Sequence, residues 1–352
     1  MKIAYVVDWK GKPNAGAPQK IHDQISIWRD NQCIVDLYSI VPHQYEAEWK
    51  LQSKKVFIYS NVLQRIIARA VCAINVIRDK EINLVYRRFA IWEFLEIISF
   101  LIKPTVVEIN TNNKEYYKGK SLLFLLVLKI QNLIISRYVV GACSVTEELK
   151  IIQSTRIMHK TRVFTNSIKL QVNSSKLLAN NHKFGQRISL VFLASDSFKW
   201  NGIEMLAVLA KDFPEFDFHV VGLTGLKTKN LFWHGPLYGD ELSNFLFDMD
   251  FGISTLAIDS LNLKQAAPLK SRTYLAHGLP TIGAYQDSAF IECDFFLQVV
   301  FDKNTFQLLD KKQFLAFINK WNGKKVNLER LDSINSNFVE RNRSDFMRSL
   351  VE

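Results

Sequence analysis

Short apolar runs alternate with amphipathic segments along most of this chain. Residues 1–9 (MKIAYVVDW) form the first apolar run, and a Gly/Pro-rich loop (KGKPNAGAPQ) follows it. The next segment carries Ile21, Ile25 and Trp28 at helical spacing, and residues 33–41 (CIVDLYSIV) form a second apolar run. A strand, a loop, a helix and another strand in this order are typical of the start of a parallel α/β domain.

The same alternation continues along the chain with one interruption. Residues 169–187 (KLQVNSSKLLANNHKFGQR) are polar and lack the periodicity, which indicates a linker. We therefore predict two Rossmann-like α/β domains facing a central ligand cleft, at 1–168 and 188–335, and a C-terminal helix at 336–352 that can pack back on the first domain. Helices are expected at 19–31, 62–80, 122–137, 146–153, 201–213, 239–249, 311–323 and 329–350. Strands are expected at 83–89, 105–110, 138–145, 162–168, 188–195, 216–222, 231–237, 250–257 and 279–285.

The composition narrows the class of protein. At 352 residues, with 48% hydrophobic and 22% charged residues, the chain is globular and long enough for two domains. Its four cysteines are scattered, form no CxxC motif and follow no signal peptide, which favours buried thiols in a reducing cytoplasm. No apolar run reaches about 18 residues, so we expect no transmembrane helix.

The net charge of +11 lies almost entirely in the first half of the chain. Residues 1–168 hold 24 Lys+Arg and 14 Asp+Glu, a balance of +10, whereas residues 169–352 hold 21 and 20, a balance of +1. A one-sided positive field suits an anionic surface, either phospholipid or nucleic acid, although an ordinary basic soluble domain has the same composition. The amphipathic segment 62–80 is a candidate membrane-surface helix, and its plainer interpretation is a helix packed on a sheet.

The segment Lys264–Tyr285 (KQAAPLKSRTYLAHGLPTIGAY) carries the most informative chemistry. Pro268 opens a helix whose first turn contains Lys270 and Arg272, although cations at that end oppose the helix dipole. A bound diphosphate would account for both, because cations and helix N-termini stabilise its oxyanions. The plainer alternative is that both are solvated surface cations.

The order of motifs in the second half resembles the nucleotide-sugar-binding domain of bacterial GT-B glycosyltransferases. The stretches LVFLASDSFKWNGIEMLAVLA, FHVVG, FWHGPLYGDELSNFL, DFGISTLA and APLKSRTYLAHGLPTI carry the resemblance over residues 188–285. Before them the likeness is looser: PNAGAPQKIHDQI stands at the family's glycine-containing first loop, and VFTNSI at a strand that ends in Asn. The likeness is closest to the retaining group-1, or family-4, enzymes that build surface polysaccharide such as capsule or O-antigen.

The resemblance implies a nucleotide diphosphate-sugar donor in the C-terminal domain and an acceptor in the N-terminal domain. Glu108 and Asn110 within VEINTNN, near the family's acceptor-side position, are the candidate catalytic contacts, to the acceptor or to the donor sugar. The glycines among the donor candidates have the alternative role of ordinary turn or capping residues. The expected donor-binding residues are Gly16, Lys199, Asn201, Gly202, Gly222, Gln265, Pro268, Leu269, Lys270, Ser271, Arg272 and Thr273.

Several positions depart from the pattern of the family. The two glutamates that commonly grip the donor ribose align with Gln265 and Thr273. The Arg and Lys of the second domain's first loop align with residues 195–196 and with Asn201, and Lys199 is close enough to substitute for one of them. Neutral groups hold a hydroxyl less firmly than a carboxylate does. The same departures therefore also fit a catalytically weak or inactive binding subunit of a polysaccharide assembly complex.

We expect a glycosyltransferase that moves a hexosyl or deoxyhexosyl group, with retention, to a glycan or undecaprenyl-pyrophosphate-linked acceptor. The departing diphosphate is expected to help deprotonate the acceptor hydroxyl, so the protein supplies alignment and charge stabilisation. The expected location is the cytoplasm, or the inner face of the cytoplasmic membrane as a peripheral protein.

The sequence favours no metal, cofactor or nucleic-acid partner. Asp248-Met249-Asp250 is interpreted as turn chemistry at a helix-to-strand junction. Four of the seven histidines, His22, His219, His234 and His277, are separated along the chain without ligand spacing, and each is interpreted as structural. GKPNAGAP does not provide the GxGxxG of a dinucleotide-dependent oxidoreductase, and no module interleaves basic and aromatic residues for nucleic acid.

Overall fold

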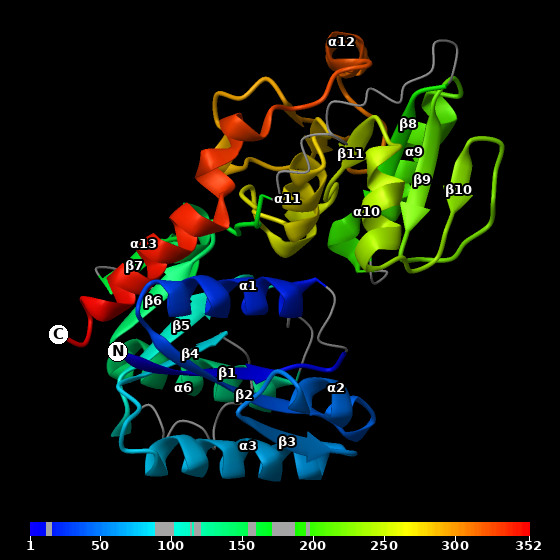
Figure 1. The fold of residues 1–352 in the computed structure, drawn as a ribbon. Helices are drawn as coiled ribbons and strands as arrows, with labels where there is room; N and C mark the ends of the chain where they lie inside the picture. Colours follow the sequence, from blue (N-terminus) through cyan, green and yellow to red (C-terminus); the bar gives the residue numbers. More distant parts are fainter. Residues whose placement is uncertain are drawn as a thin grey trace. The chain divides into compact units, whose positions relative to one another are not determined.

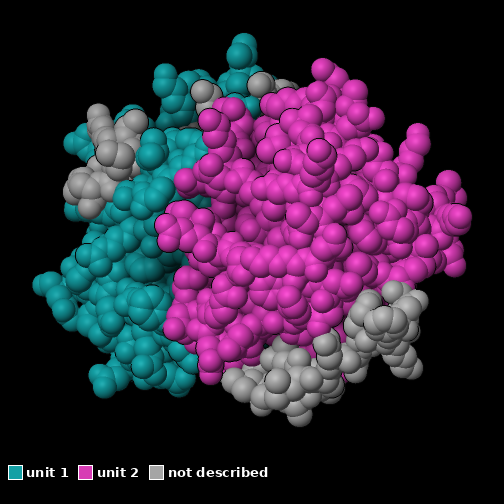
Figure 2. Space-filling view, turned by 90° about the horizontal axis from the view of Figure 1, so that it is seen from above, with its two compact units in different colours: residues 1–165, 336–352 teal, residues 166–335 magenta. Residues whose placement is uncertain are grey.

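The chain forms two compact units, which Figure 2 distinguishes by colour. Unit 1 consists of Met1–Thr165 and Ser336–Glu352, and unit 2 of Asn166–Asn335. Most of the segment predicted as a linker, residues 171–186, lies outside the described residues. The computed structural model describes residues 1–11, 16–88, 102–112, 115, 121–153, 160–170, 187–194 and 198–352.

Unit 1 is built on a parallel sheet with the strand order β3-β2-β1-β4-β5-β6-β7 within the described ranges. Its apolar runs form strands because both faces of the sheet are covered by helices. The strands are β1 (Lys2–Asp8), β2 (Ile34–Pro42), β3 (Lys55–Tyr59), β4 (Leu84–Arg88), β5 (Thr105–Ile109), β6 (Gly141–Ser144) and β7 (Thr161–Val163). The helices are α1 (Ala17–Asp30), η1 (His43–Tyr45), α2 (Glu46–Lys50), α3 (Val62–Arg78), α6 (Leu122–Tyr138), α7 (Glu147–Gln153) and α13 (Ser336–Arg348).

Alternate residues of β1 enter two different cores. Ile3 and Tyr5 pack with α1 and α13, whereas Ala4 and Val6 pack with α3 through residues that include Cys72. Figure 1 draws α1 above the strands of unit 1 and α3 below them. Helix α3 therefore covers the sheet, as its plainer sequence interpretation predicted. No helix in the described part of the chain is long and apolar enough to cross a membrane.

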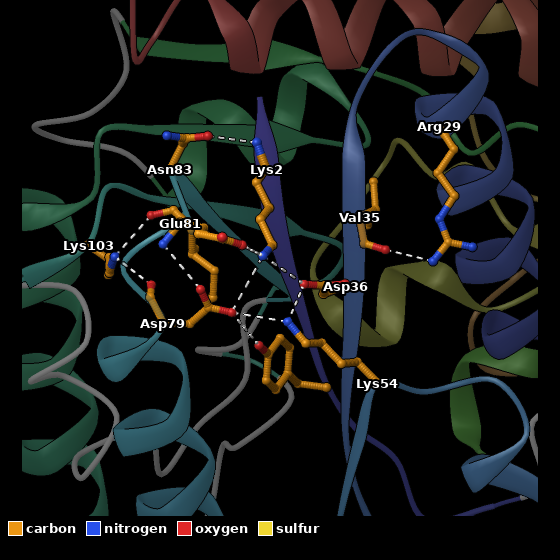
Figure 3. A network of polar contacts seen from close by, with 11 residues as sticks. Lys2, Arg29, Val35, Asp36, Lys54, Asp79, Glu81, Asn83 and Lys103 are labelled. Carbon is orange, nitrogen blue, oxygen red and sulfur yellow. Dashed lines mark hydrogen bonds and ion pairs between the residues drawn. The ribbon is translucent and has the colours of Figure 1, made fainter.

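An ion-pair network ties the amino-terminal ends of the unit 1 strands together (Figure 3). Lys54, directly before β3, bridges the carboxylates of Asp36 (2.7 Å) and Asp79 (3.1 Å), and Lys2 of β1 also contacts Glu81. Ligands of parallel α/β sheets bind at the opposite, carboxyl ends of the strands. We therefore interpret this network as structural.

Unit 2 repeats the architecture, with the parallel strand order β10-β9-β8-β11-β12-β13 among the residues described. Its main core packs the aromatic side chains of Phe213, Phe216 and Phe314 against the strands. The strands are β8 (Ser189–Leu193), β9 (Asp217–Val221), β10 (Leu231–Trp233), β11 (Phe251–Ile253), β12 (Thr281–Gly283) and β13 (Phe296–Gln298). The helices are η3 (Lys199–Asn201), α9 (Ile203–Asp212), α10 (Gly239–Phe247), η4 (Ile258–Leu261), α11 (Leu269–Ala276), η5 (Ser288–Phe290), α12 (Lys311–Trp321) and η6 (Leu328–Ile334).

Candidate functional site

The strand order of unit 2 reverses between β8 and β11. From β8 the chain proceeds to β9 and β10 on one side, and from β11 it proceeds to β12 and β13 on the other. The carboxyl ends of two such neighbouring strands form the usual ligand crevice of an open α/β sheet. Helix α9 follows β8 and helix α11 follows β11, so both helices begin on this side of the sheet.

Tyr274 fixes α11 over this switch point. Its hydroxyl donates to the backbone oxygen of Ile253 in β11 (2.9 Å) and accepts from the backbone N–H of Leu193 in β8 (2.6 Å). The ring is fully buried and lies against Gly252, where an added Cβ would approach within 2.3 Å of the ring. The start of α11 is thereby held at a fixed position above the two strands.

The first turn of α11 has no side-chain cap. Pro268 precedes the helix with φ −65° and ψ 143°, and within the described ranges no side-chain cap hydrogen bond is made at this end. Those N–H groups have no partner inside the helix and carry the positive end of its dipole. The hydroxyls of Ser271 and Thr273 donate to the backbone oxygens of Pro268 (2.8 Å) and Leu269 (3.1 Å). The helix start can therefore receive an anion.

Lys270 is a cation of this region that pairs with no described carboxylate. Its Nζ donates to Oδ1 of Asn201 (2.8 Å) and lies 4.5 Å from the centroid of the Phe192 ring. Within the part of the chain that is described, no carboxylate pairs with it. Burial lowers the pKa of Lys270 to about 7, because the charged form loses hydration and no described carboxylate replaces it. A bound anion would supply the missing charge.

Gly202 and Asn201 form the other side of the site. Gly202 has the left-handed conformation (φ 74°, ψ 45°) and opens α9, again without a side-chain cap. A Cβ there would lie 2.7 Å from the Cβ of Leu256, so the position requires glycine. The backbone oxygen of Asn201 accepts from the N–H of Leu256 (3.1 Å), which ties the loop after β8 to the loop after β11. The structure thus brings together Asn201, Gly202 and Lys270.

Arg272 has a different environment from Lys270. Its guanidinium pairs with both carboxylate oxygens of Asp287, and both side chains are 0% exposed. Its Nε donates to the backbone oxygen of Asn166 (2.9 Å). Contrary to the expectation that it joins Lys270 at a diphosphate, Arg272 is placed as a structural residue that holds α11 to two loops of unit 2.

The other donor candidates of unit 2 lie around the same region or beside it. Gln265 is half-buried, and its backbone forms a bridge with Gln286. Gly222 directly follows β9 with φ 99°, and its N–H donates to the backbone oxygen of Gly235 (2.6 Å). Lys199 is exposed. Residues 195–196, which align with the family's arginine, lie outside the described residues.

Glu108 lies inside unit 1. Its carboxylate is 3% exposed and accepts from Lys20 (2.6 Å) and from Arg343 of α13 (2.7 Å). Burial opposes its ionisation, but the positive charges of Lys20 and Arg343 outweigh burial and hold the pKa of Glu108 well below its usual range. This geometry argues against the expected catalytic contact and indicates a structural ion cluster that joins α1, β5 and α13.

Asn110 lies directly after β5 and, unlike Glu108, has a side-chain atom without a hydrogen-bond partner among the described residues. Its Nδ2 is buried and has no hydrogen-bond partner among the described residues. Buried amide nitrogens are normally hydrogen-bonded, so this Nδ2 is a candidate donor to a substrate oxygen. Its assignment as a substrate contact therefore stays a prediction. So does that of Gly16, which precedes α1 in unit 1 with φ 59°.

The imidazole rings of His219 and His234 lie next to each other. Nδ1 of His219 in β9 lies 3.0 Å from Nε2 of His234, which directly follows β10. Burial and the neighbouring ring lower the pKa of His219 to about 4. Their separation along the chain therefore does not keep the two side chains apart in space. Among the described residues, no group of three or more His, Cys, Asp or Glu side chains is placed to hold a metal ion.

Three residues that hold the site together escaped the sequence analysis. Tyr274 anchors α11, Asp287 pairs with Arg272, and the Nδ2 of Asn166 donates to the backbone oxygen of Ala267 next to the start of α11 (2.6 Å). The Oδ1 of Asn166 is buried without a hydrogen-bond partner in the described ranges. The available signal was the Asn within VFTNSI, at the end of a strand in the family's pattern.

No family model matches this chain, and no curated protein matches it. Solved structures match it along its whole length. A glycosyltransferase from Rickettsia africae is 14% identical with a TM-score of 0.65, covering 100% of this chain and 98% of that chain. Anabaena HepE in complex with UDP and glucose is 13% identical with a TM-score of 0.68, covering 99% and 100%. UDP-GlcNAc 2-epimerase from Neisseria meningitidis bound to UDP-GlcNAc is 12% identical with a TM-score of 0.57, covering 99% and 100%.

These likenesses establish the fold. The chain has the α/β GT-B fold of two Rossmann-like units, as the sequence predicted. Because both a glycosyltransferase and an epimerase are among the similar structures, the fold by itself leaves the reaction undecided.

Proposed function

We propose that this protein is a glycosyltransferase whose donor, a nucleotide diphosphate-sugar, binds at the β8–β11 switch point of unit 2. The single observation that carries the proposal is the ammonium of Lys270, which is half-buried, lacks a carboxylate partner among the described residues and lies at the uncapped start of α11. A diphosphate fits such a site, because it would receive hydrogen bonds and positive charge at the same place.

The proposed reaction moves a hexosyl or deoxyhexosyl group with retention. The bond between the sugar carbon and the diphosphate oxygen breaks, a bond from that carbon to an acceptor oxygen forms, and the acceptor proton passes to the departing diphosphate. The role of Lys270 and the α11 backbone N–H groups is to stabilise the negative charge that develops on the leaving group. No metal is part of the proposal.

The acceptor that we propose is a glycan or an undecaprenyl-pyrophosphate-linked saccharide of bacterial surface-polysaccharide synthesis, met at the inner face of the cytoplasmic membrane. The cationic first half of the chain and the resemblance in the motifs support this choice. The neutral Gln265 and Thr273 favour the alternative of an inactive GT-B subunit that binds nucleotide without turnover.

Release of free nucleotide separates the two possibilities. We expect one member of a panel of UDP-, GDP-, TDP-, ADP- and CMP-linked sugars to be consumed faster when an acceptor fraction is added, and UDP-sugars are the first to test because HepE and the epimerase were solved with uridine nucleotides. Lys270→Met should lower the rate by about a hundredfold. Binding without consumption of any donor would favour the inactive subunit.

Nucleotide affinity should weaken as the pH rises above about 7. A bound diphosphate raises the pKa of Lys270, so above this pH the complex retains a proton that the free protein has lost. The dissociation constant should then rise by up to about tenfold per pH unit. Calorimetric titration in buffers of different ionisation enthalpy measures both the slope and the proton uptake. The same slope in Lys270→Met would contradict the assignment.

A further inference from the structure

Helix α3 presents an apolar face to solvent. It packs on the unit 1 sheet through Ala68, Cys72 and Val76. A helix on the surface of a globular protein is usually polar on its outer side. The outward residues of α3 are instead mostly aliphatic: Val62 (77% exposed), Leu63 (67%), Ile66, Ile67, Val71 and Ile74.

Helix α6 also presents exposed aliphatic residues, on the same face of the sheet as α3. The connections β3–α3–β4 and β5–α6–β6 both advance in the same direction across the strand order. Right-handed crossovers therefore place both helices on one face, opposite α1, and Figure 1 shows α3 on that side. The exposed aliphatic residues of α6 are Leu122 (86% exposed), Leu123, Leu126, Ile130 and Leu133. We call this set and that of α3 the α3–α6 face.

The charged residues of α3 and α6 are all basic. Neither α3 (VLQRIIARAVCAINVIR) nor α6 (LLFLLVLKIQNLIISRY) contains an acidic residue. Arg65 and Arg69 turn inward to the carboxylate of Asp8 at the end of β1. The exposed cations are Arg78 on α3 and Lys129 and Arg137 on α6.

We propose that the α3–α6 face docks on an anionic phospholipid surface. On α3 and α6, exposed aliphatic side chains occur with cations and without acidic residues, which matches a bilayer interface, where the chains enter the acyl boundary and the cations meet anionic headgroups. A protein partner is a poorer match, because protein interfaces are enriched in aromatic residues and this set is almost wholly Leu, Ile and Val. Two copies of this chain would bring cations of the same sign together.

Vesicle flotation of the full chain tests this surface. Vesicles of phosphatidylglycerol and phosphatidylcholine should carry the protein, binding should fall with added salt, and phosphatidylcholine alone should carry little. The double variant Leu63→Gln/Ile67→Gln should lose at least about tenfold in affinity, since two aliphatic side chains leave the acyl boundary. Lys129→Gln/Arg137→Gln should reduce the salt dependence. Leu226→Gln, which replaces an exposed leucine of unit 2 (89% exposed), is the control and should bind as the wild type does.

Several outcomes would overturn the proposal. Absence of binding to anionic vesicles at low salt is one, and unchanged binding by Leu63→Gln/Ile67→Gln is another. A concentration-dependent dimer that the same variant dissociates would instead assign the α3–α6 face to self-association. Nucleotide binding by unit 2 is measured in every variant, so a failure of membrane docking is distinguished from a failure of the proposed sugar transfer and from misfolding.

Discussion

Replacing Arg272 by methionine is expected to lower the free energy of unfolding of unit 2 by about 3–5 kcal/mol. The change removes the guanidinium that neutralises Asp287, whose carboxylate is 0% exposed, and it also frees the backbone oxygen of Asn166. A buried charge without its partner accounts for most of the loss. Hydrogen exchange should accelerate by about a hundredfold or more in β11 and β12, while unit 1 keeps its wild-type rates.

Two further variants show whether geometry or charge is responsible. Arg272→Met/Asp287→Asn should recover much of the stability, because the unpaired charge is then gone. Arg272→Lys should recover little, since an ammonium cannot reproduce the paired contacts of a guanidinium. A stable Arg272→Met protein that has lost nucleotide binding would reinstate the original expectation that Arg272 contacts the diphosphate.

Replacing Arg343 by methionine should destabilise unit 1 to a similar extent, by about 3–5 kcal/mol. Arg343 is 0% exposed and contacts both Glu108 (2.7 Å) and Glu340 (3.4 Å), and its removal leaves Lys20 as the cation that pairs with Glu108. The loss should appear in hydrogen exchange of β5 and α13, with unit 2 unaffected.

The pH dependence of this variant has a definite sign. With Arg343 gone, burial raises the pKa of one of the two carboxyl groups above its value in the unfolded chain, so the folded state binds the additional proton. The destabilisation should therefore be largest above that raised pKa and should shrink as the pH falls through it. Arg343→Met/Glu340→Gln should remove both the loss and its pH dependence. A loss that is equal at all pH values would point to packing around Phe164 and Tyr86.

The opposite environments of Lys270 and Arg272 could have been expected from helix geometry. Residues two positions apart point to nearly opposite sides of a helix, so only one of them can face a given ligand. The sequence indicated that cations open this helix, but not which one faces the strand ends. That choice depends on Asp287, which lies in a different loop and forms the buried pair with Arg272.

The alternation of apolar and amphipathic segments predicted the α/β architecture well but omitted two strands. β3 (Lys55–Tyr59) is a half-exposed edge strand next to three polar residues, and β13 (Phe296–Gln298) has only three residues, so neither shows a long apolar run. The structural role of Glu108 was equally hidden. Its partner Arg343 lies 235 positions away and reaches it only because α13 folds back on unit 1.

The contact between His219 and His234 depends on strand register. β9 and β10 are parallel neighbours in which His219 lies opposite Phe232, so His234 comes two residues later along the partner strand. Their separation of 15 positions in the sequence matches no ligand motif, and the pairing of two short strands brings the rings together. Spacing rules cannot predict such contacts without knowledge of the sheet.

The measurement that tests the account most directly is calorimetric titration of the nucleotide panel into the wild type, Lys270→Met and the control Lys312→Met, which replaces an exposed lysine of α12. We predict that one nucleoside diphosphate binds the wild type and the control equally. It should bind Lys270→Met about 10- to 100-fold more weakly, the loss of one hydrogen bond to a charged group. Equal affinity in Lys270→Met, or no binding of any nucleotide to the wild type, would contradict the assignment of the switch point in unit 2 as the donor site.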